Sequence, residues 1–173
     1  LIYLENKDYR NAIEHLSRAA SLDPHNPKIL FKLGIAFLDI NRLEEALNIF
    51  RRITEIDPRN ADAHVNMGVI YFQKGMYDQA IDSYLKALQI KPDMVEARYN
   101  KAVAFAEKGM HEKAIEDYQK ALELDPTNPE IMINMAISYK AIGLREKARE
   151  LLMLALKHDP HNEVAREHLR SLQ

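Results

Sequence analysis

The sequence contains seven histidines, and their spacing shows whether they could bind a metal ion. His158 and His161 flank a proline, and His168 follows among glutamates, but neither H-E-x-x-H nor a Cys/His cluster of a zinc site occurs. There is also no G-x-S-x-G motif, no Ser/His/Asp grouping and no glycine-rich nucleotide fingerprint. The sequence therefore predicts a protein that is not an enzyme and that has no metal site and no cofactor.

Three asparagines offer a different chemistry, because they recur at one spacing of 34 residues: Asn66, Asn100 and Asn134. A side-chain amide both donates and accepts hydrogen bonds, so a regular row of amides suits the backbone of an extended ligand. The alternative is that the same amides only support the packing of the chain. Either interpretation needs elements that repeat with the same period.

The whole chain keeps that 34-residue period. The repeated types are proline (Pro24, Pro58, Pro92, Pro126 and Pro160), alanine twelve residues earlier (Ala12, Ala46, Ala80, Ala114 and Ala148), and a large apolar residue eight residues earlier (Leu16, Phe50, Tyr84, Tyr118 and Leu152). Between them, apolar residues recur at three- and four-residue steps, which predicts two amphipathic helices per period. Each second helix must end before its proline, because the residue preceding proline is disfavoured in helical geometry.

This pattern strongly resembles the tetratricopeptide repeat over nearly the whole chain. The second full repeat carries the family's pattern at His64, Met67, Gly68, Tyr71, Ala80, Tyr84, Ala87 and Pro92, with His64 where the family often has Trp. In the third repeat, Lys101 stands where the family has Leu. The resemblance implies an all-α, right-handed superhelical solenoid of antiparallel helix pairs. We expect one domain over residues 1–173: a partial repeat (1–26), full repeats (27–60, 61–94, 95–128 and 129–162) and a capping helix (163–173).

Turn and cap residues predict where these helices begin and end. Gly75, Gly109 and Gly143, with Asn41 at the equivalent place, are expected in the left-handed conformation that ends a first helix. Asn26-Pro27 and Asn128-Pro129 each read as an N-cap followed by proline at the first helical position. Residues 93–96 read as a capping box that starts one residue early. Gly34 and Gly68 are expected to permit close packing of paired helices.

In proteins of this family a second stripe of each first helix lines a concave face where peptides bind. Counting each repeat from 27, 61, 95 or 129, position five holds Phe31, Val65, Tyr99 and Ile133, and position nine holds Ile35, Val69, Val103 and Ile137. Position twelve includes Leu38 and Phe72, and position six holds Lys32, Asn66, Asn100 and Asn134. An apolar row facing solvent would favour a binding surface. The alternative is that curvature of the solenoid buries these residues between repeats.

Acidic residues recur at position two of three repeats, at Asp62, Glu96 and Glu130. They would attract a basic peptide, or they would only offset the helix dipole in the first turn, which is the interpretation we favour from sequence. The family's clamp for chaperone C-terminal carboxylates maps onto Phe31, Ile35, Asn66, Glu96 and Asn100. The clamp's cations are absent there, so no binding of chaperone tails is predicted.

The composition limits the partners and the compartment. A net charge of -2 and a pI near 6.4 argue against a nucleic-acid partner and against an anionic membrane. No apolar run is long enough to span a bilayer, so no membrane insertion is expected, and a cytoplasmic location is the default. Leu1–Leu4 would leave half of an apolar helix exposed, which suggests a chain that was cut from a longer protein or processed, and any targeting signal could be lost with the missing part. The last helix reads as a polar cap, with Arg166, Arg170 and Gln173 on its outer face.

The sequence therefore predicts a non-catalytic scaffold that binds a peptide or helix of a partner protein in its concave groove. Two alternatives stay open. The segment could be the substrate-recruiting arm of a larger, glycosyltransferase-like enzyme. It could also be a structural scaffold that associates with further copies of itself.

Overall fold

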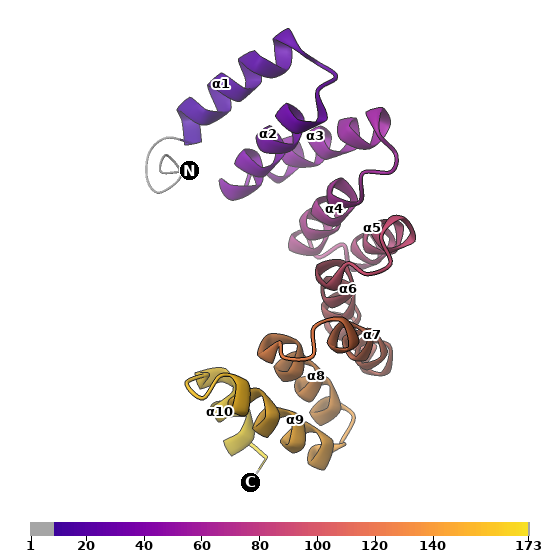
Figure 1. The fold of residues 1–173 in the computed structure, drawn as a ribbon, viewed down its shortest axis with the longest axis vertical. Helices are drawn as coiled ribbons and strands as arrows, with labels where there is room; N and C mark the ends of the chain where they lie inside the picture. The colour runs from indigo at the N-terminus through magenta and orange to yellow at the C-terminus, as the bar shows by residue number, and fades with distance from the viewer. Residues whose placement is uncertain (1–8, 173) are drawn as a thin grey trace. The chain divides into compact units, whose positions relative to one another are not determined.

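The computed structural model describes residues 9–172, and within that range it contains ten helices and no strand (Figure 1). The helices are α1 (Tyr9–Leu22), α2 (Pro27–Asp39), α3 (Leu43–Ile56), α4 (Ala61–Gln73), α5 (Tyr77–Ile90), α6 (Val95–Glu107), α7 (His111–Leu124), α8 (Pro129–Ala141), α9 (Arg145–His158) and α10 (Glu163–Arg170). Every helix that precedes one of the five periodic prolines ends two residues before it, as predicted. None of the helices in this range combines the length and the apolarity needed to cross a membrane.

The helices form two compact units, one of α1–α5 and one of α6–α10, with the boundary between Ile90 and Lys91. In the first unit each helix packs against the next one along the chain, and the same holds in the second unit. In the second unit, α8 also contacts α6 and α10, so alternate helices lie side by side there. Each unit therefore contains whole helix pairs, α2/α3 and α4/α5 in one, and α6/α7 and α8/α9 in the other.

The core of each pair is built from the periodic alanines and large apolar residues. The alanines twelve residues before each of the last four prolines are fully buried: Ala46, Ala80, Ala114 and Ala148. The large residues four positions later, Phe50, Tyr84, Tyr118 and Leu152, are equally buried. Gly34 and Gly68 face two of these rings: a Cβ on Gly34 would lie 2.8 Å from Cζ of Phe50, and one on Gly68 would overlap the ring of Tyr84. The predicted role of both glycines in close packing is confirmed.

The predicted turn residues also have the expected geometry. Gly75, Gly109 and Gly143 have φ values of 71°, 72° and 82°, and Asn41 has 59°. These left-handed residues end the first helices, and the backbone N–H of the next residue then bonds back to the preceding turn, as Met76 N does to the carbonyl of Tyr71 at 2.9 Å.

The caps follow the prediction at two of three places. The side-chain oxygen of Asn26 accepts from the N–H of Lys28 and of Ile29, and Asn128 caps α8 in the same way. The capping box predicted at residues 93–96 is wrong: Met94 is the N-cap of α6 and makes no side-chain cap bond. Because α6 begins at Val95, Asp93 lies one residue outside the position from which a carboxylate caps a helix.

At the other end, α10 packs on α8 and α9. Ala165 is fully buried, while Leu169 and Leu172 contact the core, as expected for the inner side of a cap. Arg170 is exposed, and Arg166 donates to the carbonyl of Pro160 at 2.6 Å. The expectations for Leu1–Leu4 and Gln173 lie outside the described residues.

Candidate functional site

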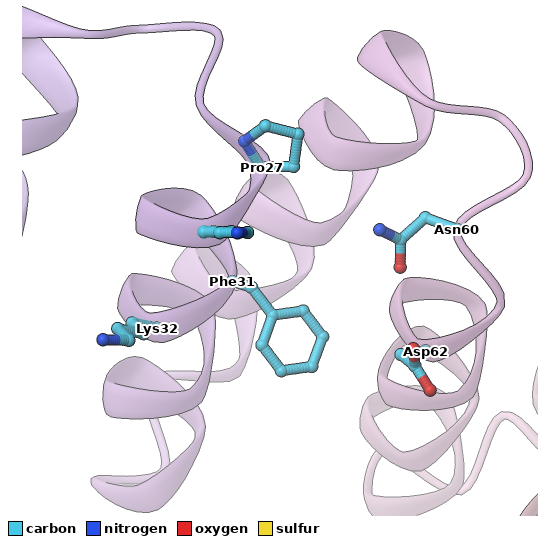
Figure 2. Close-up of a pocket in the computed structure, with 6 residues that line it drawn as sticks. Pro27, Phe31, Lys32, Asn60 and Asp62 are labelled. Atoms are coloured by element: carbon cyan, nitrogen blue, oxygen red, sulfur yellow. The ribbon is translucent and has the colours of Figure 1, made fainter.

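A crevice of about 390 Å³ lies between the first turns of α2 and α4. It is lined by Pro27, Lys28, Phe31, Lys32, Asn60 and Asp62. Figure 2 shows the ring of Phe31 directed from α2 toward Asn60 and Asp62, with Lys32 on the opposite side of helix α2. Phe31 is held by an edge-on contact with Phe50 of the core, at 5.5 Å between ring centroids. Two lysines and one aspartate give this crevice a net positive charge.

A second crevice of about 390 Å³ lies between the first turns of α6 and α8. It is lined by Val95, Glu96, Tyr99, Asn100, Asn128, Glu130 and Ile131. Its residues occupy positions one, two, five and six of one repeat, together with the N-cap and positions two and three of the next. The crevice between α2 and α4 is lined by the same positions except position three, two repeat lengths earlier. The fold therefore forms one kind of crevice in each unit, and the side chains around it differ in charge.

Tyr99 connects the two helices of the second crevice. Its hydroxyl donates to Oε1 of Glu130 at 2.7 Å and accepts from Nδ2 of Asn134 at 2.9 Å. Burial raises the pKa of Tyr99, and the hydrogen bond to the Glu130 carboxylate raises it further. The ring lies 6.0 Å from that of Tyr118, whose pKa burial also raises. Tyr99 is thus a neutral, fixed wall of the crevice rather than a loose side chain.

The three periodic asparagines differ in their hydrogen bonds. Nδ2 of Asn66 donates to the carbonyl of Asp62 at 2.8 Å, and Nδ2 of Asn134 donates to the carbonyl of Glu130 at 3.1 Å. Both amides thus bond to their own helix one turn earlier, which is a structural use. The side chain of Asn100 makes no hydrogen bond with the described residues, and it lines the second crevice. Of the predicted asparagine row, Asn100 has the amide most available to a ligand.

The apolar rows are only partly on the surface. The expectation that position five faces solvent is wrong for Val65 and Ile133, whose exposed fractions are 2% and 5%. Phe31 and Tyr99, at the same position, are half-buried and line crevices. The remaining predicted positions are also half-buried: Ile35, Val69, Phe72, Val103 and Ile137. The alternative, that these apolar residues are buried between repeats, therefore holds for Val65 and Ile133.

Sequence reasoning missed Lys28, Asn60 and Asn128 as crevice residues. Their place in the repeat is the signal that could have found them. Lys28 is at position two of a first helix, and Asn60 and Asn128 are N-caps of first helices. Position five of the same helices was already predicted to bind a ligand. For Glu96 and Glu130 the sequence left two roles open, attraction of a basic peptide and compensation of the helix dipole, and favoured the second. The structure shows in addition that first-turn residues of neighbouring first helices line the same crevice.

A buried ion pair explains the departure at Lys101. Nζ of Lys101 lies 3.0 Å from Oδ1 of Asp117 on the paired helix α7, and Nη1 of Arg98 lies 3.8 Å from the same oxygen. Nη2 of Arg98 also donates to the carbonyl of Pro92 at 2.7 Å. The pair lies inside the α6/α7 interface rather than in a crevice, so its role is in packing.

The predicted packing role of His64 is consistent with its contacts. The ring is half-buried and its Nε2 lies 3.3 Å from the carbonyl of Pro58. In the part of the chain that the structure describes, no group of three His, Asp or Glu side chains is arranged to hold a metal ion.

Comparisons with known proteins agree with this architecture. Sequence models described as tetratricopeptide repeat match residues 3–67, 95–128 and 117–150, and one described as TPR repeat matches residues 68–109. The chain belongs to the tetratricopeptide repeat family. Its fold is the all-helical solenoid of that family, whose members are protein-interaction scaffolds.

Solved structures of similar fold include MamA, which is 26% identical with a TM-score of 0.83, over 88% of this chain and 90% of that chain. MamA from Desulfovibrio magneticus RS-1 is 20% identical with a TM-score of 0.82, over 90% of this chain and 88% of that one. TTC0263, a thermophilic TPR protein of Thermus thermophilus, is 22% identical with a TM-score of 0.72, over 95% and 90% of the two chains.

A curated relative matches a shorter stretch. The Hsp70/Hsp90 co-chaperone CNS1 of Saccharomyces cerevisiae is 44% identical over 43 residues, which is 25% of this chain and 11% of that protein. The present chain therefore spans only a small part of that relative's length.

Proposed function

We infer that this tetratricopeptide repeat chain binds a peptide of a partner protein along the stripe formed by positions five, six, nine and twelve of its first helices. The observation that carries the proposal is the recurrence of one crevice, about 390 Å³ in both cases, at equivalent positions of α2/α4 and α6/α8. Each crevice has an aromatic wall, Phe31 or Tyr99, and a volume that is sufficient for a side chain of a ligand. Side chains of a ligand would enter these crevices.

Further support comes from groups along the stripe that are not committed to the fold. The Asn100 amide is free to donate to, and accept from, a peptide backbone. Half-buried Val69 and Val103 would add apolar contact. Because the crevice walls are fixed by core contacts and by the Tyr99 hydrogen bonds, little side-chain entropy would be lost on binding.

The experiment is a peptide-display selection on the 173-residue chain, followed by affinity measurements on substituted chains. Phe31→Ala and Asn100→Ala each alter one crevice, while Gln79→Ala removes an exposed amide from the second helix α5 and serves as the control. We expect the enriched peptides to bind the control like the parent chain and to bind at least one crevice variant more weakly. Circular dichroism checks that all variants keep their helicity. Enriched peptides that bind all three variants like the parent would contradict the proposal.

The two alternatives predict different results. A self-associating scaffold would show a mass that rises with concentration in light scattering and would enrich no peptide. A recruiting arm of a larger enzyme would enrich peptides, and those peptides would match substrates of a catalytic domain in the longer protein. We do not propose chaperone tails as ligands, since the positions of the family's carboxylate clamp hold Phe31, Ile35 and Glu96 in place of a lysine, an asparagine and a second lysine.

A further inference from the structure

The crevice between α6 and α8 carries negative charge that the fold does not neutralise. Glu96 and Glu130 are both exposed and both line it, and no Lys, Arg or His is among its lining residues. No ion pair of the described residues includes either carboxylate, and the Glu130 carboxylate accepts only from the neutral Tyr99 hydroxyl at 2.7 Å. The nearby cations Arg98 and Lys101 are directed to Asp117 inside the helix pair.

The helix N-termini around this crevice offset only part of that charge. Each N-terminus is equivalent to roughly half a positive charge, so two of them leave the two carboxylates about one charge in excess. At α8 the first N–H groups are already bonded, because Oδ1 of Asn128 accepts from the N–H of Glu130 and of Ile131. An anion would therefore find no free donors at the start of α8, and a cation would find carboxylate acceptors.

The equivalent crevice shows that these carboxylates are not required to start a first helix. At position two, where Glu96 stands in α6, α2 has Lys28, and its first turn contains no acidic residue. Helix α2 is nevertheless regular and is capped by Asn26. Dipole compensation by an acidic residue is thus dispensable at this position, so Glu96 and Glu130 are not needed merely to start their helices.

The other walls of the crevice suit one kind of cation. Tyr99 lines the crevice with an aromatic ring, the kind of group on which a planar cation stacks, and the free Asn100 side chain offers a carbonyl oxygen as an additional acceptor. A guanidinium group stacks on aromatic rings and donates to carboxylates in a forked geometry, whereas an ammonium group is a compact, more strongly hydrated charge. The combination of ring, carboxylates and amide therefore matches arginine better than lysine.

We propose that the crevice between α6 and α8 binds an arginine side chain of the partner peptide. This inference rests on the proposed function, because it names the ligand chemistry of one of its two crevices. In the bound state the guanidinium lies between Glu96 and Glu130 and against Tyr99. The crevice between α2 and α4, with its net positive charge, does not share this preference.

The test uses peptides enriched on the 173-residue chain and a substituted chain, Glu96→Gln/Glu130→Gln. Glutamine keeps the side-chain shape and an oxygen that accepts from the Tyr99 hydroxyl, so only the charge is removed. The control is Glu116→Gln/Glu123→Gln, which changes the net charge equally at two exposed positions of α7 outside the crevice. Each enriched peptide is measured together with a version in which arginine is replaced by glutamine.

We expect the enriched peptides to share an arginine, and their affinity to fall about tenfold in the Glu96/Glu130 variant and to change little in the control. The arginine-to-glutamine peptide should lose about as much on the parent chain and lose nothing further on the variant. Peptides that bind without a basic residue, or that lose affinity equally on the control, would overturn the arginine assignment while leaving peptide binding intact. If no peptide is enriched, the proposed function itself is overturned.

Discussion

The buried pair of Lys101 and Asp117 should be worth little to stability when intact and should cost much when half of it is removed. Their side chains are 11% and 8% exposed, and Nζ to Oδ1 is 3.0 Å. At that distance and an effective dielectric of about 20, the attraction is about 5.5 kcal/mol, and desolvation of the two charges offsets most of it. Removing one partner leaves the desolvation cost without the attraction.

The two single substitutions should differ because Arg98 lies 3.8 Å from the same Asp117 oxygen. We expect Asp117→Leu, which leaves two cations without their carboxylate, to lower the free energy of unfolding by about 4 kcal/mol. Lys101→Met leaves Asp117 beside Arg98 and should cost about 2 kcal/mol. The double substitution copies the apolar types found at the same two positions of the fourth repeat, Met135 and Leu151, and should lie within about 1 kcal/mol of the parent.

The assay is urea unfolding followed by far-ultraviolet circular dichroism, with the m-value compared among the four chains to confirm that the same surface unfolds. The single effects sum to about 6 kcal/mol, so the double variant should be far more stable than additivity predicts. A double variant whose loss equals the sum of the two single losses would refute the reasoning, because the two charges would then not be coupled.

Three further outcomes follow from the packing, the ionisation and the caps. Gly68→Ala should destabilise the chain by about 1–3 kcal/mol, because the added Cβ overlaps the Tyr84 ring. Gly75→Ala should cost less, because its Cβ meets open space and only the positive φ is strained. Equal shifts of the melting temperature would contradict this order. Because the folded-state pKa values of Tyr99 and Tyr118 are raised above the unfolded value of about 10, the folded state is favoured below that pH and loses stability above it. Tyrosinate absorbance should show part of the tyrosine ionisation displaced to higher pH, and Tyr99→Phe should reduce both that part and the alkaline loss of stability. Asn60→Ala removes the acceptor for the N–H of Ala63 at 2.9 Å and should cost about 1 kcal/mol in thermal unfolding, whereas Asn66→Ala, which removes no cap, should cost less.

Much of the fold could be predicted because its signals are local and repeated. A left-handed turn requires glycine or asparagine at one position, as at Gly75 and Asn41, and an N-cap requires an acceptor directly before the helix, as at Asn26. Each such signal recurs with the period, so one register fits all of them. The capping box predicted at residues 93–96 was wrong because it requires Asp93 to be the N-cap. The helix begins one residue later than that, and composition alone does not fix a helix start to within one residue.

The candidate site was less predictable because it depends on distances between helices. Position five places Val65 and Tyr99 on the same stripe, yet one is buried and the other lines a crevice. The free amide of Asn100 and the bonded amide of Asn134 are likewise identical in sequence terms. Lys101 stood out as a departure, but its partner Asp117 lies on another helix, and only the packed pair identifies it. Periodicity thus defines candidate positions, and contacts decide among them.

Some hydrogen bonds join side chains of successive repeats. They determine whether the removal of one or of two whole repeats would leave a donor facing its acceptor. Nη2 of Arg51 donates to the hydroxyl of Tyr71 in the next repeat at 3.0 Å, and Nε2 of Gln119 donates to that of Tyr139 at 3.3 Å. At the equivalent position between these tyrosines the sequence has Phe105, which has no hydroxyl. Excising residues 61–94 would set Arg51 before Phe105 and leave the guanidinium without its acceptor, whereas excising residues 61–128 would set it before Tyr139 and restore the bond. For this hydrogen bond, the excision of two repeats keeps the match between neighbours and the excision of one repeat does not.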